Sequence, residues 1–181
     1  FRDVLLVLGE YPGPEEPPGS DFAGLVTERG ASISTFKPGT CVMGMAPGCL
    51  VHFVRARTSV NLVTIRPQCI SAQDACTLPS TWTTAHEVLR RAHIGSRHGF
   101  LLHAAAGGVG IAATDYLLRL HSTLCTTSGQ PGKHRPIRGQ GIGRCCSSRN
   151  AAAFTYGLLS FQMGARLHGV CNSLINDFIV V

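Results

Sequence analysis

The sequence predicts an α/β fold in two parts, and three observations along its 181 residues lead to this. Residues 1–80 are punctuated by proline and glycine, as is typical of a β-rich domain. Residues 81–181 alternate short apolar runs with longer amphipathic ones, which indicates βαβ units and a parallel sheet. A glycine-rich turn also lies where one expected strand gives way to a helix. We place the domain boundary near residues 76–84.

The elements of each part can be placed from their apolar runs and turn residues. In the first part, after a turn-rich loop, we expect three short strands, at residues 22–28, 41–45 and 50–54. Their alternation is weak, so no pairing order follows. In the second part we expect helices at residues 83–91, 110–121 and 151–162. Between them we expect strands at residues 100–103, 122–127 and 167–171.

The composition indicates a folded protein. The chain is 44% hydrophobic and 14% charged, which suits a packed core better than disorder. Its apolar runs are far shorter than the ~20 residues that span a bilayer, and no signal peptide is visible. We therefore expect no membrane segment, and a cytoplasmic or plastid location. Because the chain starts without Met and stops within an apolar pattern, we interpret it as a fragment, with both domains incomplete.

The charge is distributed unevenly. The net charge is +6, yet residues 1–115 hold nine basic and nine acidic side chains. Residues 116–176 hold seven basic side chains and no acidic one, which favours an anionic ligand. The basic residues are scattered and lack interleaved aromatics, so nucleic acid is disfavoured. A phosphate-bearing cofactor fits better.

The eight cysteines show no metal-binding pattern. None form a C-x-x-C pair and no four have zinc-finger spacing. We expect reduced thiols, several of them buried as small apolar side chains, and no structural metal.

The glycine-rich turn from Ala104 to Gly110 has the features of a dinucleotide site. Because glycine has no Cβ atom, it permits the sharp turn from strand to helix. For the same reason it lets a pyrophosphate approach the backbone closely. A small residue at Gly110 lets the helix pack near the strand, and the helix N-terminus attracts the anion. The usual first glycine is Ala105 here. The predicted contacts are Ala106, Gly107, Gly108, Val109 and Gly110. The alternative is a turn whose glycines serve packing alone.

The segment after the next strand selects the nucleotide. NAD-binding folds place an acid ~20 residues further on, for the ribose 2′-hydroxyl. Residues 125–134 contain no acid but offer Thr127, Ser128 and Lys133. Hydroxyls and cations suit a 2′-phosphate, so the cofactor is predicted to be NADPH. Lys133 could equally be a solvated surface lysine.

Several motifs in the same order resemble one family. Residues 103–110, H-A-A-A-G-G-V-G, resemble the cofactor turn of the enoyl reductase domains of polyketide synthases and animal fatty acid synthase, which are medium-chain reductases. Further matches are F-R-D-V-L-L (1–6), G-S-D-F-A-G (19–24), V-M-G-M-A (42–46), S-S-R (147–149) and N-S-L (172–174).

This resemblance implies a GroES-like β domain followed by a Rossmann domain. It implies that NADPH gives hydride to the β-carbon of an enoyl thioester carried on an acyl carrier protein, after which the α-carbon takes a proton. The partners would be neighbouring synthase domains, with a homodimer formed through the parent synthase. Ser20 stands where zinc-dependent relatives have His, so no catalytic zinc is expected.

The resemblance also assigns roles to single residues. Ser128, Lys133 and Arg149 would meet the 2′-phosphate, Thr84 would lie by the nicotinamide, and Asn172 by the cofactor ribose. Thr84 could instead cap a helix N-terminus, and Asn172 could be a turn residue at a strand end.

No catalytic residue is assigned. Leu5 stands where some relatives have a candidate Tyr donor, and Tyr11 fits a loop residue better. Pro136 and Gly139 weaken an expected short helix, and residues 144–146 replace a plain apolar strand with R-C-C. Two other functions therefore stay open: a non-catalytic nucleotide-binding module and a free-standing quinone or enone reductase.

Overall fold

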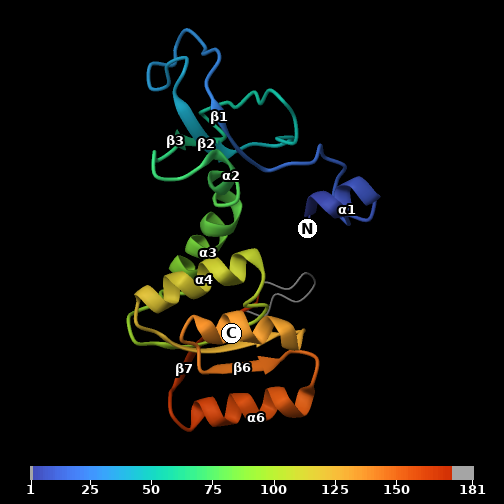
Figure 1. Cartoon of the computed structure of the whole chain (residues 1–181), viewed down its shortest axis with the longest axis vertical. Coiled ribbons are helices and arrows are strands. Elements are labelled where there is room, and N and C mark those ends of the chain that lie inside the picture. Colours follow the sequence, from blue (N-terminus) through green and yellow to red (C-terminus); the bar gives the residue numbers. More distant parts are fainter. Residues whose placement is uncertain (1, 173–181) are drawn as a thin grey trace. The chain divides into compact units, whose positions relative to one another are not determined.

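The structure, a computed structural model, describes residues 2–172 of the chain. Two compact units make up the chain, Phe1–Ser80 and Thr81–Val181. The first carries a three-stranded antiparallel sheet and the second a four-stranded parallel sheet (Figure 1). This arrangement confirms the predicted α/β fold.

The first unit is built on strands in the order β1-β2-β3. Its elements are α1 (Arg2–Leu8), β1 (Asp21–Leu25), β2 (Cys41–Met45), β3 (Leu62–Ile65) and α2 (Ala72–Ala75). The central strand β2 contacts its neighbour closely at Gly44, where a Cβ atom would overlap the carbonyl oxygen of Leu62. Glycine at this position therefore lets β2 and β3 pair.

The strand predictions for this unit succeeded in part. The predicted strand 41–45 is confirmed as β2, whereas β1 ends at Leu25, earlier than expected. The strand predicted at 50–54 is wrong, because these residues form an irregular loop in which Phe53 is 81% exposed. The third strand is instead β3, which the sequence did not predict. An apolar run becomes a strand only where a neighbouring strand can pair with it.

Helix α3 (Pro79–Arg91) begins in the first unit and continues into the second. A carboxylate oxygen of Asp21 accepts hydrogen bonds from the backbone N–H of Ser80 (3.0 Å) and from its hydroxyl (2.7 Å). A negative charge at a helix N-terminus is stabilising, and proline suits the first helical position. The helix predicted from residue 83 therefore starts four residues earlier.

The second unit alternates strands and helices as predicted. Its strands are β4 (Gly99–Leu102), β5 (Thr123–Ser128), β6 (Arg144–Ser147) and β7 (Leu167–Cys171). Its other elements are α4 (Gly108–Arg119), the 3-10 helix η1 (Pro131–Lys133), α5 (His134–Gly139) and α6 (Ala151–Gln162). The strand order is β6-β5-β4-β7, with every pair parallel.

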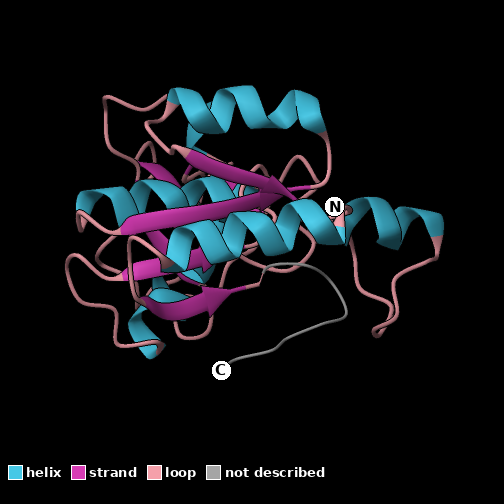
Figure 2. Ribbon diagram, turned by 90° about the horizontal axis from the view of Figure 1, so that it is seen from below, coloured by secondary structure: helices cyan, strands magenta, loops and turns pink. Residues whose placement is uncertain are grey.

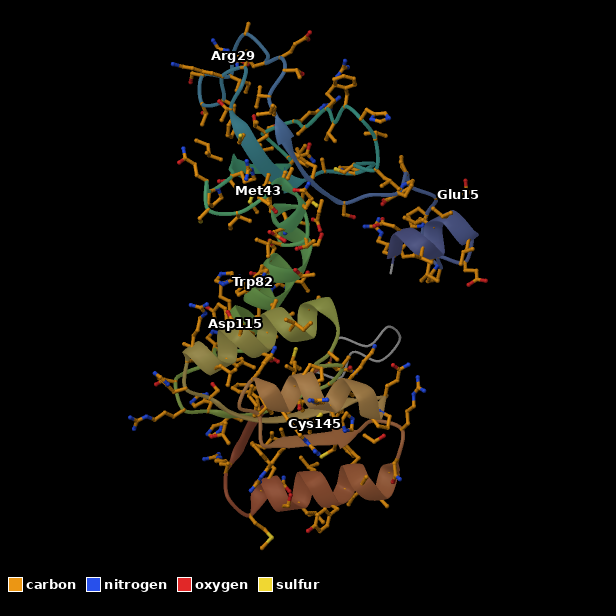
Figure 3. All side chains as sticks on the ribbon, viewed as in Figure 1. Glu15, Arg29, Met43, Trp82, Asp115 and Cys145 are labelled. Atoms are coloured by element: carbon orange, nitrogen blue, oxygen red, sulfur yellow. The ribbon has the colours of Figure 1, made fainter. Side chains whose placement is uncertain are left out.

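Helices cover both faces of this sheet (Figure 2). One apolar cluster joins the second-unit part of α3 with α4, α5 and one sheet face, and it includes Leu89, Leu102 and Leu117. Cys145 lies in this layer (Figure 3). The second cluster joins α6 to the other face through Leu101, Cys125 and Phe161. Because both faces are covered, all four residues of β4 are buried.

The short helix and the strand that the sequence made doubtful, at Pro136 and at residues 144–146, both form. Pro136 is the third residue of α5, a position whose N–H needs no partner within the helix, so the proline is tolerated. Strand β6 forms despite its polar sequence. The Arg144 guanidinium donates to the Ser160 carbonyl at the end of α6 and lies 5.7 Å from the centre of the Phe161 ring.

Two further features concern the described part of the chain. No helix within residues 2–172 has the length and apolar character needed to cross a membrane. All eight cysteines fall in this range and are free thiols, four of them buried.

Candidate functional site

The strand order creates a topological switch point at β4, on the carboxyl edge of the parallel sheet. From β4 the chain proceeds to β5 and β6 on one side, and then returns to place β7 on the other side of β4. The connection that leaves the carboxyl end of β4 therefore leads to the side away from β7. In open parallel sheets, ligands bind at such a switch point. The glycine-rich turn leaves β4 at this edge.

The turn is held by backbone hydrogen bonds. The His103 N–H donates to the Cys171 carbonyl of β7 (2.8 Å), and the Ala105 N–H donates to the Thr127 carbonyl of β5 (3.0 Å). Between them, Ala104 adopts the left-handed conformation, with φ of 53°. Its carbonyl accepts from the Gly107 N–H (2.9 Å), which positions the residue that precedes α4.

The three glycines of the turn have different packing requirements. A Cβ on Gly110 would overlap the Ala104 carbonyl oxygen and backbone atoms of Ala105, so helix and turn can pack only with glycine there. By contrast, Gly107 and Gly108 are exposed. A Cβ on Gly107 would meet only the Ala104 oxygen, at 3.3 Å, and one on Gly108 would meet a methyl carbon of Thr81, at 3.0 Å. Packing therefore explains Gly110 but does not require the other two.

The start of α4 is open to an anion. Its N-cap residue, Gly107, has no side chain to accept from the first helical N–H groups. Such groups attract anions, as does the positive end of the helix dipole. Ala106 and Val109 pack against the apolar core, so they can offer only backbone groups.

The end of β5 is buried and polar. Thr127 is fully buried, and its hydroxyl lies 3.0 Å from Nδ1 of His103. Ser128 is 3% exposed, and its carbonyl oxygen lies 3.1 Å from Nε2 of His134. Burial lowers the pKa of His103 below its ordinary value of 6.5, so its imidazole is neutral near pH 7.

One predicted cation lies against the β5 loop. A Cβ on Gly129 would lie 3.0 Å from Nε of Arg149, which places this guanidinium beside the residue that follows Ser128. The hydroxyl oxygen of Ser148 would also lie close to this Cβ, at 3.5 Å. Lys133 is exposed at the end of η1. The loops after β5 and β6 thus bring a hydroxyl and a cation together at the carboxyl edge.

The two remaining predicted residues lie on separate elements. Thr84 is exposed and is the sixth residue of α3, so the alternative that it caps the helix N-terminus is wrong. Asn172 directly follows β7 and is half-buried, at the edge that carries the turn. The other residues of its motif, Ser173 and Leu174, lie outside the described residues.

Sequence reasoning assigned no role to two residues of this edge, His103 and Ala104. His103 was noted only as a strand end, yet its ring contacts Thr127 and lies 5.6 Å from the ring of Phe154 in α6. A polar residue that ends an otherwise apolar strand was the available signal. The left-handed conformation of Ala104 had no signal, because alanine rarely adopts it.

Two other features do not contribute to this edge. A hollow of about 330 Å³ lies at the opposite edge, lined by residues that include Ser122, Ile142 and Arg144. Burial, assisted by contact with Cys146, raises the pKa of Cys125 to about 12, so this thiol is not a nucleophile near neutral pH. Among residues 2–172, no group of three or more His, Cys, Asp or Glu side chains could hold a metal ion.

Comparison with known proteins relates the chain to polyketide synthases. No family model matches. The chain is 38% identical over 143 residues to erythronolide synthase EryA2 of Saccharopolyspora erythraea, covering 78% of this chain and 4% of the synthase. It is 30% identical over 182 residues to a highly reducing polyketide synthase of Didymella fabae, covering 98% of this chain and 9% of that protein.

Solved structures with the same fold include reductases. The CurK enoyl reductase aligns with a TM-score of 0.84 and 29% identity, covering 96% of this chain and 55% of that one. Escherichia coli quinone oxidoreductase, solved with NADPH, aligns with a TM-score of 0.73 and 26% identity, covering 91% and 51%. The chain thus spans about half of these structures and a small part of the synthases.

Fold and homology together define the class of this chain. The chain has the fold of the medium-chain oxidoreductases that include quinone oxidoreductases. Within that class, its homologues are type I polyketide synthases and its structural neighbours include enoyl reductases. The family resemblance seen in the sequence is therefore confirmed.

Proposed function

We propose that this chain is part of an NADPH-dependent enoyl reductase, which reduces an enoyl thioester carried on an acyl carrier protein. One observation carries the nucleotide part of the proposal. Helix α4 begins at the switch point without a side-chain cap, behind two exposed glycines that packing does not require. A pyrophosphate needs such a surface of backbone N–H groups.

Residues at this edge would meet the pyrophosphate, a ribose and the 2′-phosphate of the cofactor. Gly107 and Gly108 leave the backbone accessible to a pyrophosphate, and Asn172, which follows β7 at the same edge, would lie near the ribose. Arg149, beside Gly129, and Lys133 would pair with the 2′-phosphate. The absence of acidic side chains from residues 116–176 supports this, because a carboxylate would repel that group. When bound, NADPH would supply the hydride that reduces the conjugated double bond.

Arg149 and Lys133 make this choice of nucleotide testable. Fluorescence titration of the intact protein should show tighter binding of NADPH than of NADH. Arg149→Ala should lower NADPH affinity about tenfold, or about 1.4 kcal/mol, since a hydrogen bond to a charged group contributes that much. NADH affinity should not change.

Lys133→Ala is the matched variant, which removes the second predicted cation from the end of η1. It should also weaken NADPH alone. Arg119→Ala, on the far end of α4 from the turn, is the control and should change neither affinity. Equal binding of both nucleotides to the wild-type protein would contradict the 2′-phosphate assignment.

The resemblance to polyketide synthases supports the substrate. A crotonyl thioester of pantetheine mimics the carrier-bound chain, and NADPH oxidation can be followed by absorbance. Reduction of the crotonyl double bond in preference to a benzoquinone would support an enoyl reductase. Reduction of the quinone alone would favour a free-standing quinone reductase, as the similarity to the Escherichia coli enzyme would then suggest.

A non-catalytic module is the remaining alternative, and it would bind NADPH without oxidising it. We propose that the partners are the acyl carrier protein and neighbouring domains of the parent synthase, with any homodimer formed through that synthase. Co-purification of the acyl carrier region with the intact protein would test this. Domain composition of the parent protein would test it independently.

A further inference from the structure

Ala104 is the strained residue of the glycine-rich turn. A non-glycine residue in the left-handed conformation is strained, and it persists only where its surroundings hold it. The other described non-glycine residues with positive φ, His93, Arg97 and His121, are all exposed. Ala104 alone is half-buried, and it stands between strand β4 and the open start of α4.

A single residue of the neighbouring strand holds both sides of Ala104. The Thr127 hydroxyl lies 3.0 Å from Nδ1 of His103, the residue before it. The Thr127 carbonyl accepts from the N–H of Ala105, the residue after it, also at 3.0 Å. Because Thr127 is fully buried, its side chain cannot touch a nucleotide. It acts on the turn through its contact with His103.

The effect reaches the helix start through one carbonyl group. Ala104 in its left-handed conformation directs its C=O to the N–H of Gly107, at 2.9 Å. Gly107 is the N-cap residue of α4. The orientation of Ala104 therefore sets the position of Gly107 and of the helical N–H groups behind it.

We propose that Thr127 and His103 are positioning residues, which hold Ala104 in its strained conformation and so preorganise the turn for the pyrophosphate. This inference rests on the proposed function, since it concerns the same nucleotide site. It differs from the sequence prediction for Thr127, which gave that residue direct contact with the cofactor. A preorganised site binds more tightly because the ordering cost is met on folding.

The proposal separates Thr127 from Arg149 by what each should change. The pyrophosphate is common to NADPH and NADH, so loss of the Thr127 hydroxyl should weaken both nucleotides by the same factor. Loss of Arg149 should affect NADPH only. A ratio of the two affinities therefore reports which part of the site has been changed.

The test uses variants of the intact protein that are close in shape. Thr127→Val keeps the volume and removes the hydroxyl, and about a tenfold loss of affinity for both nucleotides is expected, since it removes the contact between this hydroxyl and Nδ1 of His103. Thr127→Ser keeps the hydroxyl and should restore most of the affinity. Thr126→Val is the control, because Thr126 is equally buried and its hydroxyl donates to the Arg144 carbonyl, not to the turn.

Denaturant unfolding of each variant shows whether stability alone has changed. Thr126→Val and Thr127→Val should lose similar stability, but only Thr127→Val should lose affinity in the folded protein. Unchanged affinity in Thr127→Val, or the same loss in Thr127→Ser, would overturn the inference and leave the proposed function standing. If the wild-type protein binds neither nucleotide, the proposed function fails and the inference fails with it.

A double-mutant cycle with Ala104→Gly tests the strain directly. Glycine adopts a positive φ without steric cost, so the turn in Ala104→Gly has less strain for Thr127 to hold. Thr127→Val should then cost less affinity in the Ala104→Gly protein than in the wild-type protein. Equal costs in the two backgrounds would mean that the residues act independently, which would overturn the proposed mechanism.

Discussion

The two units use similar apolar residues in opposite ways. In the second unit, β4 is buried at all four positions between two helical layers. In the first unit, three of the four residues of β3 are exposed, including Leu62 and Ile65. A covered parallel sheet makes each apolar residue part of the core, whereas an antiparallel sheet with an open face does not. Apolar character therefore predicts burial only where another layer exists.

The largest expected effect contrasts the two units directly. Leu102→Ala leaves a cavity at a fully buried site of β4, and should cost about 2–5 kcal/mol of unfolding free energy. Leu62→Ala, at a position 60% exposed in β3, should change stability by less than about 0.5 kcal/mol. Urea unfolding of the intact protein measures both. Similar losses of unfolding free energy in the two variants would contradict this difference between the two units.

The glycine-rich turn contrasts two sites within the second unit. Gly110→Ala forces a Cβ against backbone atoms of Ala104 and Ala105, and should cost about 1–3 kcal/mol of stability. Gly107→Ala removes no side-chain cap and should cost less than about 1 kcal/mol. For nucleotide affinity the order should differ, since Gly107→Ala places a methyl group where the proposed site would receive the pyrophosphate. If Gly107→Ala leaves the affinity unchanged, the glycine serves only the turn.

The smallest expected effect is a dependence of stability on pH. Burial lowers the pKa of His103, so the unfolded chain takes up the proton more readily than the folded protein. The stability from the neutral imidazole is fully present above about pH 6.5 and decreases as the pH falls from there towards the lowered pKa of the folded state. Unfolding of His103→Gln between pH 5 and 7, roughly the range in which histidine titrates, should show a flatter pH dependence than the wild-type protein.

His52→Gln is the matched control for this experiment, because it removes an exposed imidazole from the first unit. The wild-type pH dependence should persist in that variant. A flat wild-type profile would show that protonation of His103 costs the fold nothing.

Sequence patterns predicted the second unit well, with helix 151–162 and strand 167–171 placed as the structure has them. The period of apolar residues is strong there because each element has a covered face. In the first unit the strand predicted at 50–54 is a loop, and β3 was not predicted. Exposed apolar residues such as Phe53 carry no information about pairing, so pattern alone could not distinguish strand from loop.

For the candidate site, the sequence identified the turn before α4 and the segment after β5, and the structure places both at the carboxyl edge of the parallel sheet. It also singled out Arg149, which the structure places beside Gly129. It could not show which glycines serve packing. That distinction depends on the distance from each Cβ position to atoms of the turn, which only the folded backbone defines.

By itself the sequence determined the α/β fold and the family resemblance, because both depend on local patterns and on motif order. The tertiary structure alone decided how Thr127 is used, because its two contacts with residues 103 and 105 cross from one strand to the next. The same holds for Ala104, whose left-handed conformation contradicts its own preference. Local preference describes the backbone conformation that a residue adopts freely. Hydrogen bonds to distant residues decide the conformation in which the folded protein holds it.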